Sequence, residues 1–280
     1  MIHSSRDHSG PNAANHSFGV DLAHDFGGAI IFSFPLLMTM EMWWLGFYMD
    51  RFRLSLFLTL AFILVIGLSY LEGRPESFKI EILDALVAWT AGFVVASVML
   101  ILFGIIKQDM SANEIVGKIS LHAIPGSIGA ILARKLLEVE ETPKERQRRE
   151  AYFAKIFLMG AGAIFLAFQL APTEEMVLIG HRMTGWHAAA LVVVSLGIMQ
   201  AFNCSVEYRE GGGSVMSAKF LWGVFLRFTV VGYSVALLIS LYVLWTFGRL
   251  DGAAISETIR AMVVLGFPAA LGTSAARLIL

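Results

Sequence analysis

The chain has 280 residues, of which 57% are hydrophobic and only 15% are charged, and its mean hydropathy is +0.70. Soluble domains are closer to half apolar and a quarter charged. The apolar excess is gathered in long runs, so the composition predicts an all-α integral membrane protein whose main partner is the lipid bilayer. A formal net charge of −1 argues against nucleic acid as a partner, and the single cysteine, Cys204, excludes an intrachain disulfide.

Eight apolar segments follow a polar tail at residues 1–25 and predict eight transmembrane helices. In chain order they cover residues 27–49, 54–71, 84–106, 114–134, 155–179, 188–206, 219–247 and 258–280. The charged linker 138–154, which begins EVEETPKERQRRE, separates the fourth segment from the fifth and is too charged to lie in lipid. Proline and glycine interrupt the fourth segment, so a re-entrant loop is the alternative for it and for the eighth.

Two stretches of the chain recur. Residues 28–46 and 162–180 align without a gap, and nine of the nineteen positions are identical. A second pair, residues 125–137 and 268–280, shares the frame Pro-x-x-Ile/Leu-Gly-x-x-x-Ala-Arg-x-x-Leu. The repetition predicts two homologous four-helix units, at 26–137 and 155–280. Since each unit holds an even number of spans, the two units are expected to be parallel-topology repeats.

The distribution of Lys and Arg gives the expected orientation in the membrane. With eight spans and a cytoplasmic N-terminus, thirteen of these residues lie in cytoplasmic segments and five in outer loops. The outer five are Arg51, Arg53, Lys107, Arg182 and Arg249. Re-entrant fourth and eighth segments would place the basic linker outside, so the bias favours eight full spans with both termini cytoplasmic.

Glu41 and Glu175 occupy the same position in the two copies and are the leading functional candidates. Each follows a threonine, Thr39 or Thr173, in a shared Thr-x-Glu-Met motif. A carboxylate in an apolar helix is costly, so its repetition indicates a functional position. Each glutamate is expected ~20 Å along its helix, where two converging carboxylates could bind a proton or a cation. The alternative is a pair of interfacial glutamates solvated among the lipid headgroups.

Other residues inside the apolar segments are candidates for gating or structural roles. Arg134 and Arg277 are a second matched pair, either snorkelling to the interface or tied to an acid such as Asp84. His122 lies mid-span and is either a proton relay or a hydrogen-bonded packing residue. The remaining candidates are Arg227 as a cross-helix ion-pair partner, Pro125 and Pro268 as kinks, and Gly129 and Gly272 as close-packing positions.

No catalytic constellation is present in the sequence. It lacks the motifs HExxH and GxSxG, a Walker or dinucleotide-binding glycine motif, and paired cysteines. We therefore expect neither an enzyme nor a bound cofactor, and the residues assign no metal.

The segments FPLLMTMEMWWLGFYMD at 34–50 and VVLGFPAALGTSAARLIL at 263–280 resemble an uncharacterised family of bacterial integral membrane proteins of about this length. The resemblance runs from about residue 20 to the end of the chain. It implies a location in the bacterial inner membrane and carries no activity, ligand or catalytic residue.

The residues favour a small ion channel or transporter, for protons or another cation, with Glu41 and Glu175 lining the path. The alternative is a non-transporting membrane scaffold or sensor that acts through its cytoplasmic linker 138–154. The oligomeric state stays open, and a homo-oligomer is compatible with the sequence.

Overall fold

The structure is a computed structural model, and it describes residues 11–72, 78–137, 151–210 and 217–279. Within these ranges every regular element is a helix. The first group is α1 (Pro11–Leu37), α2 (Met40–Tyr48), α3 (Arg51–Glu72), α4 (Phe78–Leu102) and α5 (Ala112–Leu137). The second is α7 (Tyr152–Leu170), α8 (Glu174–Arg182), α9 (Gly185–Glu210), α10 (Ala218–Val224), the π-helix η1 (Phe225–Val230), α11 (Val231–Thr246) and α12 (Ile255–Ile279).

Seven of the described helices are long and apolar enough to cross a membrane, and an eighth span results if α1 and α2 are counted as one bent element. The seven spans are Arg51–Leu71, Lys79–Leu102, Ala112–Ala133, Tyr152–Leu170, Gly185–Tyr208, Ala218–Thr246 and Ile255–Arg277. The described residues therefore confirm the all-α class, and their helices are compatible with a membrane protein. The spans follow the order of the predicted segments. Long uninterrupted apolar runs form helices, because a helix satisfies its own backbone hydrogen bonds in lipid.

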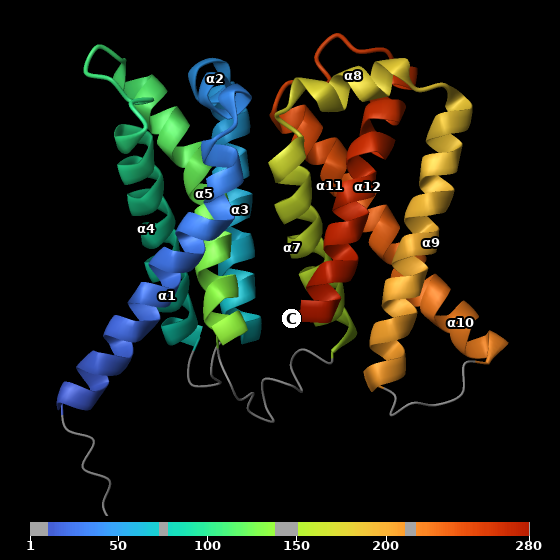
Figure 1. The fold of residues 1–280 in the computed structure, drawn as a ribbon, viewed down its shortest axis with the longest axis horizontal. Helices are drawn as coiled ribbons and strands as arrows, with labels where there is room; N and C mark the ends of the chain where they lie inside the picture. The colour runs from blue at the N-terminus through green and yellow to red at the C-terminus, as the bar shows by residue number, and fades with distance from the viewer. Residues whose placement is uncertain (1–10, 73–77, 138–150, 211–216, 280) are drawn as a thin grey trace, which may run out of the picture.

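The helices form two bundles that stand side by side, α1–α5 in the first half and α7–α12 in the second (Figure 1). The centre of the first half is α5, which packs against α1, α2, α3 and α4. The centre of the second half is α12, which packs against α7, α8, α9 and α11. The buried share of the spanning stretch is 78% for α5 and 61% for α12, whereas it is 28–39% for the other five spans. The two central helices therefore carry the core, and the others face lipid.

All the connections fall at two ends of the molecule. The helix α1 begins and α12 ends at one end, which we call the terminal end, whereas α2 and α8 lie at the opposite end, which we call the corner end (Figure 1). The helices α5 and α7 also meet the terminal end, where α5 finishes and α7 starts. The chain therefore crosses between the terminal end and the corner end an even number of times in each half.

Two of the predicted helices were wrong in their extent. The helix expected at 27–49 begins at Pro11, inside the segment predicted as a polar tail, and ends at Leu37, and α2 follows at an angle of 87°. The helix expected at 155–179 ends at Leu170, and its remaining residues belong to α8. The helices break at the residues that precede α2 and α8, Thr39 and Thr173, whose backbone is extended, with ψ of 112° and 142°.

Side-chain hydrogen bonds stabilise both corners. The Thr39 hydroxyl donates to the carbonyl of Pro35 at 2.8 Å, and the Thr173 hydroxyl donates to the carbonyl of Leu170 at 2.8 Å. The indole of Trp43 donates to the carbonyl of Leu37 at 2.9 Å. These bonds satisfy carbonyls at the ends of α1 and α7 that a continuous helix would have satisfied with its own N–H groups.

Paired glycines bring the central helices against their neighbours. A Cβ atom added at Gly28 would overlap the carbonyl oxygen of Gly129, so α1 and α5 touch backbone to backbone. In the second half, a Cβ added at Gly162 would overlap the carbonyl oxygen of Gly272 in the same way, between α7 and α12. Only residues without a side chain allow this approach, which small-xxx-small patterns produce in membrane helices. Gly129 and Gly272, the positions expected to pack closely, are thus each in backbone contact with a neighbouring helix.

The two halves meet along a seam at which α3 contacts α7 and α11, and α5 contacts α7. At the corner end the Arg53 guanidinium makes two bonds to the Asp251 carboxylate, at 2.9 and 2.8 Å, and its Cζ lies 5.0 Å from the centre of the Trp245 ring. The bonds from Arg53 hold the pKa of Asp251 below its usual value. Deeper in the seam, Gln169 Nε2 donates to the carbonyl of Phe32 at 3.2 Å.

Candidate functional site

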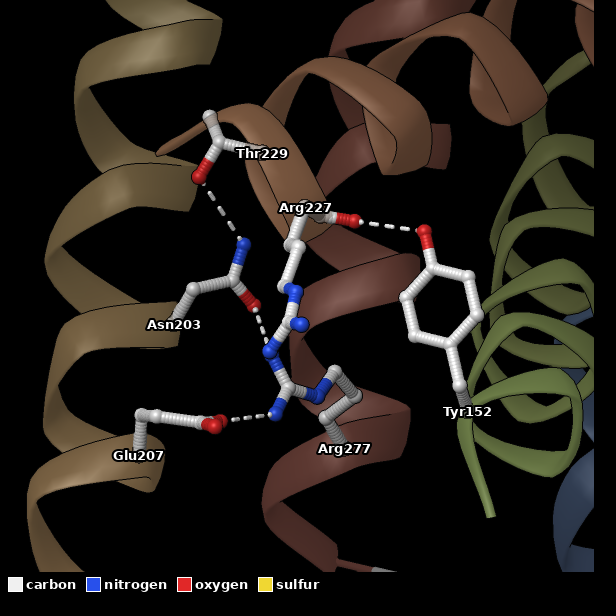
Figure 2. Close-up of polar contacts among 6 residues, drawn as sticks. All are labelled: Tyr152, Asn203, Glu207, Arg227, Thr229 and Arg277. Carbon is white, nitrogen blue, oxygen red and sulfur yellow. Dashed lines mark hydrogen bonds and ion pairs between the residues drawn. The ribbon is translucent and has the colours of Figure 1, made fainter. Parts of the chain in front are cut away.

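A buried arginine, Arg277, is the centre of a polar cluster in the second half (Figure 2). Its side chain on α12 is only 2% exposed. The Nη2 atom donates to Glu207 Oε2 at 2.8 Å and the Nη1 atom to Asn203 Oδ1 at 3.1 Å, both on α9. The guanidinium carbon lies 3.7 Å from the centre of the Phe228 ring. Three kinds of partner therefore compensate one buried positive charge, as burial of an ion requires.

The cluster continues towards the middle of the second half through uncharged groups. Asn203 Nδ2 donates to Thr229 Oγ1 at 3.2 Å, and that hydroxyl donates to Gln200 Oε1 at 2.7 Å. Gln200 Nε2 donates in turn to the carbonyl of Leu221 at 3.0 Å. The result is a file of hydrogen-bonded side chains, from Glu207 to Gln200, between α9, η1 and α12.

The π-helix η1 presents Phe228 and Thr229 to this file. Its wider turn interrupts the span formed by α10 and α11, and such turns occur frequently at functional sites. Arg227 lies on the same turn but is exposed, and its carbonyl accepts a hydrogen bond from the Tyr152 hydroxyl at 3.1 Å (Figure 2). In the described structure Arg227 makes no side-chain ion pair, so the cross-helix pairing expected for it is not found.

The first half also buries ionisable groups on its central helix. Lys118, which is 6% exposed on α5, pairs with Glu114 one turn earlier at 2.6 Å. One turn later, the fully buried His122 places Nδ1 2.7 Å from the carbonyl of Lys118. The ring also lies near the carbonyl of Leu36, but Nε2 makes no hydrogen bond within the described structure. His122 therefore faces the corner between α1 and α2 with one ring nitrogen unbonded.

Glu41 and Glu175 lie in the first turns of α2 and α8, at the corner end and over different halves (Figure 1). Glu41 is half-buried and Glu175 is exposed, and no hydrogen bond or ion pair joins them in the described structure. The expected position of each, inside a long span, was wrong because the chain turns just before it. Carboxylates in a first helical turn are favoured by the helix dipole, which accounts for their position in part.

Glu175 lines an open hollow of about 590 Å³ at the corner end. The other polar side chains of this hollow are Glu174, His181 and Arg249. Arg249 also donates to the carbonyl of Pro172 and so fixes the α11–α12 loop to the corner before α8. Next to it lies a second hollow of about 430 Å³, which Arg53, Asp251 and Arg249 line.

The remaining candidates have plainer roles. Pro125 and Pro268 lie inside α5 and α12, and neither ends its helix. Asp84 lies on α4 in the first half, and the acid that binds Arg277 is Glu207 instead. Arg134 lies on α5, and its side chain falls outside the described residues, as does the linker 138–150.

The sequence reasoning missed Glu207, Asn203 and Gln200. Glu207 was placed in a loop, because the sixth helix was expected to end at residue 206, whereas α9 continues to Glu210. The spacing of the three residues by three and four puts them on one face of a helix, and that pattern in an apolar segment was the available signal.

Comparison with known proteins gives a family. A family model described as "Putative integral membrane protein (DUF2391)" matches residues 21–280. The chain therefore belongs to this family of integral membrane proteins of unknown function. No curated protein and no solved structure matches the chain.

Proposed function

We propose that this integral membrane protein is a small channel or transporter for protons or another small cation. One observation carries the proposal, namely that the most buried helix of each half holds titratable and hydroxyl side chains inside the membrane-spanning region. Those of α5 are Lys118, Ser120, His122 and Ser127, and those of α12 are Thr273, Ser274 and Arg277. Placing such groups in the bilayer is costly, and they commonly mark ion paths and proton relays.

The path in the second half would run between the corner and terminal ends. Glu175 stands at the open hollow of the corner end, and the Glu207–Arg277 pair, with Glu207 26% exposed, stands near the terminal end. The hydroxyl and amide groups of Gln200, Asn203 and Thr229 lie inward of that pair. In this proposal Glu175 attracts the cation, and Glu41 has the same role in the first half.

We further propose that the halves are duplicated parallel units. The matched glycine contacts, Gly28 with Gly129 and Gly162 with Gly272, support this proposal, because residues paired in the sequence alignment make the same contact in each half. The order of a long helix, a short corner helix and three further spans is also the same in both.

We also propose that the protein lies in the bacterial inner membrane with both termini cytoplasmic. The thirteen-to-five distribution of basic residues supports this orientation. A Glu145→Cys variant, made in a Cys204→Ser background, should not react with a membrane-impermeant thiol reagent added to intact cells. It should react in inverted vesicles, and labelling from outside the cells would contradict the orientation.

Ion flux in liposomes tests the transport proposal. Each of Glu41→Gln and Glu175→Gln should lower proton or cation flux about tenfold or more, equivalent to ~1.4 kcal/mol, since glutamine keeps the shape and removes the charge. The matched control is Asp109→Asn, which removes an exposed carboxylate at the same end of the molecule and should leave the flux unchanged. Equal losses of flux in all three variants would show that any lost surface charge has this effect, and would contradict a specific role for Glu41 and Glu175.

A further inference from the structure

An apolar cavity of about 220 Å³ lies in the seam between the halves. Side chains from both halves line it, among them Phe32, Leu68 and Ile128 from the first and Ala161, Phe165 and Ala275 from the second. Every lining residue is Phe, Leu, Ile, Ala or Gly. Apart from Phe32 on α1, all of them belong to helices that are long and apolar enough to cross a membrane, so the cavity lies among the spans.

The cavity is separated from the water-exposed hollows of the corner end. Phe57, Phe168 and Phe247 are each buried and pack together, with ring centres 5.2, 5.3 and 6.0 Å apart. Phe247 lines the hollow that holds Arg53 and Asp251, and the other two rings pack behind it. Below them the rings of Phe32 and Phe165 meet across the seam at 5.2 Å. These aromatic rings therefore lie between that hollow and the cavity.

On the side that faces lipid, in contrast, the cavity is open. Leu132, Leu166 and Ala275, which line the cavity, are only half-buried, so the cavity opens at the molecular surface. Apolar cavities without polar partners stay dry and accept apolar ligands. Around the spans the medium consists of acyl chains, which are mobile enough to enter.

We propose that this seam cavity holds one acyl chain of a membrane phospholipid, inserted between the two halves. The acyl chain would complete the packing between the two halves. Few helix pairs join the halves, and the principal contacts come from α3, α5, α7 and α11. A segment of the protein itself is a poor occupant, because the linker EVEETPKERQRRE is highly charged and would be costly to place among phenylalanines. The proposal is independent of ion transport and holds equally for a scaffold.

Photolabelling of the full-length protein tests this site. The protein is reconstituted with a phospholipid that carries a diazirine on one acyl chain, washed briefly in detergent to remove surrounding lipid, irradiated and digested. Adducts should map to the seam peptides 161–166 and 272–276, in excess over the exposed Val193 on α9, which is 69% exposed. Adducts confined to exposed positions such as Val193 in the wild-type protein would overturn the proposal.

A pair of matched variants sharpens the result. Ala275→Phe fills the cavity and should lower seam labelling at least about tenfold, equivalent to ~1.4 kcal/mol. Ala201→Phe makes the same change on an exposed position of α9 and should leave seam labelling unchanged. Undiminished labelling in Ala275→Phe contradicts a seated chain. Seam labelling that emerges only on dilution of the protein would identify a second copy as the occupant and would also overturn the proposal.

Discussion

Replacing Arg277 with methionine should lower the free energy of unfolding by about 3 kcal/mol, as judged by thermal or denaturant unfolding in detergent. Removing one partner of a buried ion pair typically costs about 3–5 kcal/mol, because the other charge is left uncompensated. The low end applies here, since the Glu207 side chain is 26% exposed and can be partly solvated, whereas that of Arg277 is only 2% exposed. Asn203 would lose a hydrogen-bond donor as well.

The matched control is Arg227→Met, which removes an exposed arginine from the neighbouring π-helix and should change the stability by less than about 0.5 kcal/mol. The double variant Arg277→Met, Glu207→Gln should recover part of the loss, because no unpaired charge then stays in the cluster. A single Arg277→Met variant as stable as the wild type would show that the cluster contributes little to the fold.

Leucine at Gly272 should destabilise the protein by about 3 kcal/mol or more, at the upper end of the usual cost of overpacking. A Cβ atom at this position would overlap the carbonyl of Gly162, and a backbone atom cannot rotate away as a side chain can. The helices α7 and α12 would have to separate, and a buried part of α12 would lose its packing. Gly129→Leu should have a similar effect between α1 and α5, where the Cβ would meet Phe32 and the carbonyl of Gly28.

Gly197→Leu on α9 is the control for both variants. A Cβ atom there meets nothing within 4 Å, so leucine should fit without strain and should gain helix propensity over glycine. Thermal unfolding in detergent compares the three variants. Equal midpoints for Gly272→Leu and Gly197→Leu would contradict the close approach of α7 and α12.

The helices and their close-packed positions could be predicted from the sequence, because both depend on local patterns. Long apolar runs identify spans, and the Gly-x-x-x-Ala spacing at Gly129 and Gly272 identifies a face without bulky side chains. The partners of those faces, Gly28 and Gly162, were not predictable, since small residues on one helix do not specify which neighbour they meet.

The corners and the pairing inside the buried cluster were not predicted, for different physical reasons. Hydropathy continues across Thr39, so the pattern extends that helix past the point where the hydroxyl bond to Pro35 stabilises a break. Residues 172–175, Pro-Thr-Glu-Glu, interrupt the apolar run before α8 and were an available signal for the second break, where the Thr173 hydroxyl bonds to Leu170. The positions of Glu41 and Glu175 were misjudged because both breaks were missed. The pairing of Arg277 with Glu207 joins residues 70 positions apart and depends on how α9 packs against α12.

The most direct test of the transport proposal is the flux through purified protein in which both glutamates are changed. Wild-type protein in liposomes with an imposed proton or cation gradient should dissipate that gradient faster than empty liposomes. The double variant Glu41→Gln, Glu175→Gln should fall to the rate of empty liposomes while it unfolds at the wild-type temperature. Flux equal to the wild type in the double variant would contradict a role for these carboxylates and would identify them as interfacial residues.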